Sequence, residues 1–196
     1  CHKEKYNLCE HLILLNGSYA DYIKIPANIT RYNTYKLEDS TPFHQAAFTE
    51  PLAVSLRAVE YAGVQQGDHV AVIGLGPIGQ LIVKCATLKG AHVTAMARNP
   101  FKRDMAKRFG EADHVVDISD SIDTASLRQK YTPEGHGFDV VIEAVGLSEV
   151  WEKSIELARK GGVVNLFGGC KAGSSIQLDT RRLHYDEITV LSPFHH

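Results

Sequence analysis

The sequence predicts an α/β fold in which a parallel sheet is doubly wound and helices cover both of its faces. Apolar runs of strand length alternate with helical runs from residue 69 onward. The first of these strands, 69–73, leads directly into a glycine-rich turn, Gly74-Leu-Gly-Pro-Ile-Gly79. Strands this apolar are typical of parallel sheets that are buried on both faces, because each βαβ crossover places a helix over the sheet.

The segment before residue 69 is less regular. Residues 19–25 alternate apolar and polar side chains, which predicts a strand that stops at Pro26. Residues 26–41 are polar and rich in turn formers. The pattern over 42–62 is helical and is expected to break before Pro51, because a proline is tolerated in the first turn of a helix, where its missing N–H costs little.

The remaining elements follow from apolar periodicity and from helix start signals. Asn99-Pro100 is one such signal, since asparagine is a favoured N-cap and proline suits the first helical position. Strands are expected at 69–73, 92–97, 114–117, 138–143, 162–167 and 187–191, and helices at 77–89, 100–109, 121–131 and 148–159.

Composition excludes several classes of function. The chain has 196 residues, 44% hydrophobic and 22% charged, which is ordinary for a globular protein with a sizeable core. A formal net charge of −2 predicts no general attraction to nucleic acid. No apolar run is long enough to span a membrane, so no membrane association is expected. The four cysteines are not needed as disulfides at this size, which favours a reducing, cytoplasmic setting.

The glycine turn after the first strand has the spacing of a dinucleotide-binding site. Gly74 permits the sharp turn, Gly76 lets the backbone approach a pyrophosphate, and Gly79 lets the helix pack closely on the sheet. Pro77 and Ile78 open that helix, whose N-terminus attracts anions. A plain tight turn is the alternative. The strand before, the helix after and the second strand beyond favour a dinucleotide site of the Rossmann type.

The end of the second strand indicates which dinucleotide is bound. A carboxylate here would accept hydrogen bonds from a free ribose 2′-OH and would repel a 2′-phosphate. The chain has Ala97 and then Arg98, whose guanidinium suits phosphate oxygens and can stack on adenine. Asn99, Lys102 and Arg103 are candidates for further contacts; a solvated charged face is the alternative. The predicted cofactor is NADP(H).

With these motifs in view, the chain resembles the zinc-dependent medium-chain alcohol and polyol dehydrogenases, most closely the sorbitol (ketose reductase) branch. Each matching segment is weak alone, but their order and spacing are specific. The segments are Gly17-Ser-Tyr-Ala-Asp-Tyr22, Glu50-Pro-Leu-Ala53, Gly74–Gly79, Phe138-Asp-Val-Val-Ile-Glu-Ala-Val-Gly146, Gly161-Gly-Val-Val-Asn-Leu-Phe-Gly-Gly169 and Phe194-His-His196.

The resemblance implies roles for residues outside the glycine turn. Glu50 falls where the family has a zinc ligand or a glutamate beside the catalytic zinc, although a carboxylate stabilising a helix N-terminus is the other interpretation. The residues expected to border the nicotinamide end of the cofactor are Val145, Gly146, Phe167, Gly168, Gly169 and Phe194.

The resemblance also divides the chain. Residues 1–41 are expected to be a remnant of a mostly β (GroES-like) catalytic domain, and 42–196 a C-terminally truncated NADP(H)-binding domain. Cys1 and Cys9 have the spacing of the last two ligands of the family's structural zinc lobe. Two cysteines hold zinc poorly, so no ordered structural zinc is expected in this chain.

The activity implied for the intact protein is hydride transfer between NADP(H) and an alcohol or polyol, with a zinc ion polarising the substrate. This chain lacks the family's zinc-binding Gly-His-Glu segment, so we expect it to bind cofactor without turnover. A cofactor-binding module without its own chemistry is one alternative, and a zinc-independent quinone or enoyl reductase is another. A methyltransferase is disfavoured by Ala97 and Arg98. The family pairs through an edge strand near 187–193, so a homo-oligomer is a further expectation.

Overall fold

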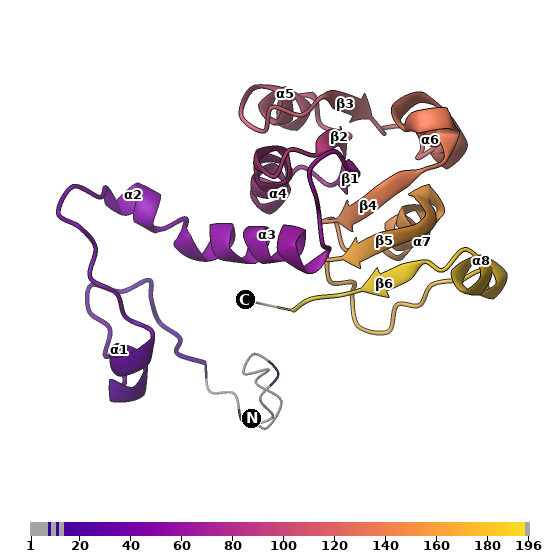
Figure 1. Ribbon diagram of the computed structural model, residues 1–196. Helices are drawn as coiled ribbons and strands as arrows, with labels where there is room; N and C mark the ends of the chain where they lie inside the picture. Colours follow the sequence, from indigo (N-terminus) through magenta and orange to yellow (C-terminus); the bar gives the residue numbers. More distant parts are fainter. Residues whose placement is uncertain (1–7, 9–10, 12–13, 195–196) are drawn as a thin grey trace. The chain divides into compact units, whose positions relative to one another are not determined.

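A computed structural model describes residues 8, 11 and 14–194 and is drawn in Figure 1. The chain divides into two compact units, residues 1–49 and 50–196. The described residues of the first unit form two short helices, α1 (Ala27–Tyr32) and α2 (Phe43–Ala46), and no strand. The sheet lies entirely in the second unit.

The strand predicted over residues 19–25 is wrong, because this segment carries no regular structure. Alternating residues stabilise a strand only when one face packs on a core and the backbone pairs with a neighbour. All seven residues are exposed, including Tyr19 and Tyr22, and the described residues pair no strand with them.

The helical segment that follows breaks before Pro51, as predicted. Helix α2 ends at Ala46, and α3 (Thr49–Tyr61) begins two residues ahead of the proline. Pro51 therefore lies in the first turn of α3, where its missing N–H removes no helical hydrogen bond. Val54, Ala58 and Val59 are buried, so this helix packs on the core of the second unit.

Six parallel strands form one sheet in the order β3-β2-β1-β4-β5-β6. This is the doubly wound order, in which successive strands are added on one side of β1 up to β3 and on its other side from β4 onward. It confirms the predicted fold class. The strands are β1 (His69–Ile73), β2 (His92–Ala97), β3 (His114–Asp117), β4 (Phe138–Glu143), β5 (Ala158–Leu166) and β6 (Thr189–Leu191).

Helices cover both faces of the sheet (Figure 1). Val70 and Val72 of β1 belong to a core shared with α3, α4 and α5, whereas Ala71 and Ile73 belong to the core under α6 and α7. Successive residues of a strand point to opposite faces, so an uninterrupted apolar run is what a twice-covered strand requires. The helices are α4 (Pro77–Leu88), α5 (Pro100–Arg108), α6 (Thr124–Tyr131), α7 (Ser148–Leu157), α8 (Thr180–Tyr185) and the 3₁₀ helix η2 (Pro133–Gly135).

Side-chain caps set where three of these helices begin, namely α5, α6 and α8. Asn99 Oδ1 accepts a hydrogen bond from the Lys102 N–H at 3.2 Å, so α5 starts where the sequence predicts. Asp123 Oδ1 accepts from the Ser126 N–H at 3.1 Å. Helix α6 therefore begins at Thr124, three residues later than expected.

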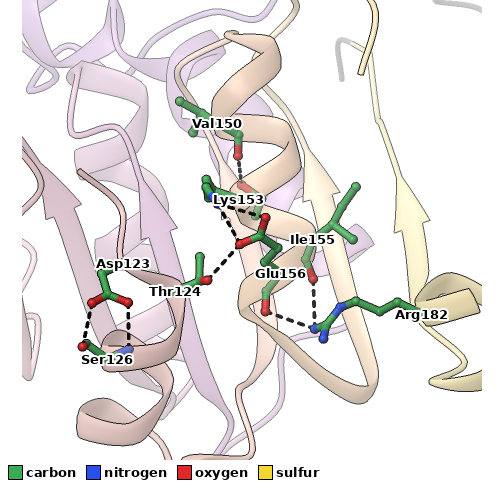
Figure 2. A network of polar contacts seen from close by, with 9 residues as sticks. Asp123, Thr124, Ser126, Val150, Lys153, Ile155, Glu156 and Arg182 are labelled. Atoms are coloured by element: carbon green, nitrogen blue, oxygen red, sulfur yellow. Dashed lines mark hydrogen bonds and ion pairs between the residues drawn. The ribbon is translucent and has the colours of Figure 1, made fainter. Parts of the chain in front are cut away.

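A polar network ties α6, α7 and α8 together on one face of the sheet (Figure 2). Thr124 Oγ1 donates to Glu156 Oε2 at 2.9 Å, and Lys153 Nζ pairs with the same carboxylate. Burial acts to raise the pKa of Glu156, but the hydrogen bonds from Lys153 and Thr124 outweigh it and hold that pKa below its ordinary value. Arg182 Nη2 donates to the Ile155 and Glu156 carbonyls at the end of α7.

Replacing Arg182 by alanine is expected to destabilise the protein by about 1.5–3 kcal/mol, because a charged donor is lost from carbonyls that end a helix. The shortest of the hydrogen bonds lost, 2.7 Å from Arg182 Nη2 to the Ala158 carbonyl, is expected to make the largest contribution to this destabilisation. Urea unfolding measures the effect. The matched control is Arg181→Ala on the same helix, because Arg181 is exposed and its loss should cost at most about 0.5 kcal/mol. Equal losses in both variants would contradict this role for Arg182.

Candidate functional site

A hollow opens at the carboxyl edge of the sheet, at the point where the strand order reverses. Open α/β sheets bind ligands at this position, because the loops leaving β1 and β4 diverge there to opposite faces. The loops after β1, β2, β3 and β4 and the start of α5 supply the lining, which consists of Gly74, Leu75, Gly76, Ala97, Arg98, Asn99, Lys102, Ile118, Ala144 and Val145.

The glycine turn places its three glycines in three different surroundings. Gly74 has φ +96°, a conformation that L side chains rarely adopt. A Cβ on Gly79 would lie 1.8 Å from the Gly74 carbonyl oxygen, so the start of α4 sits directly against the turn. A Cβ on Gly76 would meet no atom within 4 Å. The space beside Gly76 is therefore open to a ligand that approaches the backbone.

The N-terminus of α4 faces that turn. Gly76 is its N-cap and Pro77 its first helical residue, so the helix starts where the sequence predicts. Ile78 packs against the core and anchors the first turn. The first N–H groups of a helix have no partner within it and carry partial positive charge. Together with the space beside Gly76, they fit the pyrophosphate of a dinucleotide.

The end of β2 adds positive charge to the hollow. Ala97 is 6% exposed, and Arg98 and Lys102 are exposed and line the opening. Asn99 also lines it, while its Oδ1 caps α5. Among the described residues that line the hollow there is no Asp or Glu. A phosphate group in this hollow would meet two cations, whereas the carboxylates of Asp120, Glu149 and Glu152 line a second hollow on the other side of Arg98 and Ile118.

Arg103 lies beneath this rim and is held by protein groups. Its guanidinium donates to the carbonyls of Ala97, at 3.0 Å, and Arg98, and it pairs with Asp117 Oδ2 at 2.7 Å. Hydrogen bonds from Ser119, followed by the Arg103 charge, hold the pKa of Asp117 below its ordinary value. Arg103 therefore fixes the backbone that carries Arg98 and neutralises a neighbouring carboxylate. Its direct contact with a phosphate stays a prediction.

The loops after β4 and β5 lie against one another at the other end of the site. The N–H groups of Phe167 and Gly168 donate to the main-chain carbonyl of Glu143 at 3.0 and 2.9 Å. A Cβ on Gly146 would lie 2.5 Å from the Gly169 carbonyl oxygen, so these loops have no room for a side chain between them. Val145, 41% exposed, projects from the same loop and lines the hollow.

Glu143 is a residue whose importance the sequence reasoning missed. It ends β4 and is completely buried, and its Oε1 accepts hydrogen bonds from the N–H groups of Val145 at 2.6 Å and Gly146 at 2.8 Å. Burial raises the pKa of this carboxyl, although these amides and the Trp151 indole act in the opposite direction. A lone glutamate at the end of an apolar strand, three residues before a glycine, was the available signal.

The remaining predicted residues are more scattered. Glu50 is exposed in the first turn of α3, and Phe194 is exposed beyond β6. Neither contributes to the lining of the hollow in the described part of the chain. Their predicted roles beside a metal and beside the nicotinamide stay predictions.

The described residues do not form a metal site. Within 14–194, together with Leu8 and His11, no group of three His, Cys, Asp or Glu side chains has an arrangement that could hold an ion. Cys1 and Cys9 lie outside the described residues. We therefore derive no zinc-dependent step from this chain. No helix in the described part combines the length and apolar character needed to cross a membrane.

Comparison with known proteins identifies relatives of this chain. D-arabinitol dehydrogenase 1 of Uromyces fabae is 27% identical over 94% of this chain and 52% of its own length. A sorbitol dehydrogenase of Halalkalibacterium halodurans is 32% identical over 97% of this chain and 55% of its own. The chain thus spans about half the length of these curated relatives.

Solved structures agree with the sequence relatives. A Sinorhizobium meliloti 1021 protein solved with NADP bound superposes with a TM-score of 0.72 at 35% identity, covering 76% of this chain and 44% of that one. The 2R,3R-butanediol dehydrogenase of Bacillus subtilis gives a TM-score of 0.72 at 29% identity, covering 83% and 45%.

A family profile described as zinc-binding dehydrogenase matches residues 77–195, from the first residue of α4 to the C-terminal end. The match includes the strands and helices that build most of the hollow. Because it covers more than half of the chain, and because the sorbitol dehydrogenase is 32% identical along 97% of it, the chain belongs to the zinc-binding dehydrogenase family.

Proposed function

We propose that this chain binds NADP(H) and is the cofactor-binding part of an oxidoreductase that moves a hydride between NADP(H) and an alcohol or polyol. The observation that carries the proposal is the hollow at the carboxyl edge of the sheet. It combines a glycine turn with open space beside Gly76 and a rim that bears Arg98 and Lys102 without a carboxylate.

In this proposal the adenosine half of the cofactor occupies the rim between the glycine turn and the end of β2. The pyrophosphate lies beside Gly76 against the N-terminus of α4. The 2′-phosphate lies between Arg98 and Lys102, because charge-assisted hydrogen bonds from these side chains offset its charge. Arg103 holds the backbone of Arg98 from below through its bonds to the Ala97 and Arg98 carbonyls.

The nicotinamide half extends towards the loops after β4 and β5, at Val145, Gly146, Phe167 and Gly168. The bound nicotinamide supplies or accepts the hydride. The chain's own contribution is to hold the cofactor between these loops, so that the position of the ring is set by closely packed backbone. The steric fit of Gly146 and Gly168 between the two loops supports this role.

The substrate class rests on the relatives, which include dehydrogenases of arabinitol, sorbitol and butanediol. Because the chain spans about half of their length, the reaction of the whole protein is part of the proposal. We assign residues 1–41 to a catalytic domain and 42–196 to the cofactor domain. Glu50 is the candidate catalytic residue, and the edge strand β6 the candidate surface for pairing with a second copy.

Replacing Arg98 by alanine is expected to weaken NADPH binding about 10- to 100-fold and to leave NADH binding within about twofold. The reason is that Arg98 contacts the 2′-phosphate, which NADH lacks, through charge-assisted hydrogen bonds. Calorimetric titration of the purified chain with each cofactor measures both affinities.

The matched control is Arg108→Ala, which removes the same charge from the last residue of α5. Arg108 pairs with Asp104 at 2.5 Å and is 66% exposed, so its loss should leave both affinities unchanged. A wild-type chain that binds NADPH and NADH equally, or an Arg98→Ala variant that weakens both alike, would refute NADP(H) as the preferred cofactor.

A further inference from the structure

We propose that Glu143 and Trp151 are positioning residues that lock the loop after β4 onto the loop after β5, and so determine how tightly the nicotinamide half of the cofactor is held. The inference rests on the proposed function. The three groups that make this lock are the Glu143 carboxylate, the Trp151 indole N–H and the Gly168 carbonyl, and we refer to them as the clasp.

The carboxylate of Glu143 organises the loop that follows it. Its side chain is 0% exposed, and Oε1 accepts from the Val145 N–H at 2.6 Å and the Gly146 N–H at 2.8 Å. Two hydrogen bonds from successive backbone amides to one oxygen fix the local peptide planes. Because Val145 lines the hollow, the carboxylate also fixes the backbone that carries this lining residue.

Trp151 joins this loop to the next one. Its Nε1 donates to Glu143 Oε2 at 3.0 Å and to the Gly168 carbonyl at 3.0 Å. The indole belongs to the first turn of α7, so one N–H links the end of β4, the start of a helix and the loop after β5. It is the single tryptophan of the chain.

The two loops are packed closely, with no room for a side chain at Gly168. A Cβ on Gly168 would lie 2.4 Å from the Gly146 nitrogen and 2.8 Å from Glu143 Oε2. A displacement of either loop would therefore disturb the clasp as a whole. Interlocked groups of this kind adopt one arrangement or lose it together, rather than deforming gradually.

The chemistry of the clasp indicates a purpose beyond stability. Burying a carboxylate is costly, and apolar side chains of similar volume fill a core more cheaply. Here the carboxylate accepts hydrogen bonds from the loop that borders the candidate cofactor site and from the indole that reaches the second loop. A carboxyl group buried at this position is explained if the precise arrangement of these loops is what binding requires.

The test compares NADPH with 2′,5′-ADP, which carries the adenosine half of the cofactor and lacks the nicotinamide. Calorimetric titrations are made on the wild-type chain and on Trp151→Phe, which keeps an aromatic ring and removes the N–H. We expect NADPH to bind about three- to tenfold more weakly to the variant, while 2′,5′-ADP binds as to wild type within about twofold.

Glu143→Gln provides an independent second variant, because its amide turns one acceptor into a donor that faces other donors. It should show the same selective loss, and the double variant should lose less than the product of the single losses, since both act through one clasp. The matched control is Glu149→Gln on α7, where an exposed carboxylate is neutralised and both affinities should stay unchanged. If Glu143→Gln does not fold, Trp151→Phe decides the question.

The two ligands separate this inference from the proposal on which it rests. If the wild-type chain binds both and the variants weaken both equally, or weaken neither, the clasp is purely structural and the inference is wrong. If the wild-type chain binds neither ligand, the proposed function fails, and the inference falls with it. If the variants lose affinity for NADPH and keep their affinity for 2′,5′-ADP, both the proposed function and this inference are supported.

Discussion

Gly79→Ala is expected to destabilise the fold by at least about 3 kcal/mol, which is the upper part of the range for overpacked cores. The added Cβ would lie 1.8 Å from the Gly74 carbonyl oxygen. That oxygen belongs to the backbone of a turn whose φ of +96° leaves it little freedom. Helix α4 would have to move away from β1, and its buried residues Ile82 and Val83 would lose their packing.

Thermal and urea unfolding measure this loss, and Gly76→Ala is the control in the same turn. Gly76 has φ −69°, which alanine adopts readily, and its Cβ would meet nothing within 4 Å. Its stability should change by no more than about 1 kcal/mol. Its methyl group would instead occupy the space proposed for the pyrophosphate, so NADPH affinity should fall at least about tenfold. A stable Gly79→Ala protein would contradict the packing role of this glycine.

The contrast between these glycines also shows what a sequence motif can predict. The spacing of Gly74, Gly76 and Gly79 predicts the turn, and the apolar runs around it predict β1, α4 and β2 to within one residue, because these signals are local. The short helices α1 and α8 carry no such pattern and were not predicted. The start of β5 depends on a contact that is distant in the sequence. It lies at Ala158, four residues before the expected 162, because Ala158 pairs with Phe138 across a shift of register that the sequence pattern does not reveal.

The candidate site divides in the same way. Gly74, Gly76, Ala97 and Arg98, which the sequence of one βαβ unit predicts to bind the cofactor, all line the hollow. Arg103 is different. It lies on α5, whereas its partner Asp117 ends β3, and only the fold shows that the two side chains meet. A helix-period argument places Arg103 near the end of β2 but does not say which acceptor it meets.

Glu143 shows the same limit more clearly. The sequence presents a glutamate after five residues of strand, which suggests an exposed strand end. The amides of Val145 and Gly146 and the indole of Trp151 turn towards it and make its burial tolerable. Although these donors all lie between residues 143 and 151, their sequence does not show that they fold back onto the carboxylate, and the Gly168 carbonyl that shares the indole N–H comes from a separate segment.

Phe138→Ala is expected to destabilise the protein by about 3–5 kcal/mol, a large share of the 5–15 kcal/mol typical of a folded domain. Phe138 is 0% exposed at the amino end of β4 and packs in the core beneath α6 and α7. Urea unfolding measures the loss, and Phe101→Ala on α5 is the control, since that ring is 68% exposed and should cost at most about 0.5 kcal/mol.

The same variant separates the stability of the fold from the function of the site. Phe138 and Glu143 are the two ends of one strand, and the proposed cofactor site lies at the carboxyl end. The folded fraction of Phe138→Ala should therefore bind NADPH with wild-type affinity at a temperature well below its unfolding transition. Weaker binding by fully folded Phe138→Ala protein would mean that the cavity left by the ring reaches the loops after β4, and that the core and the site are not independent.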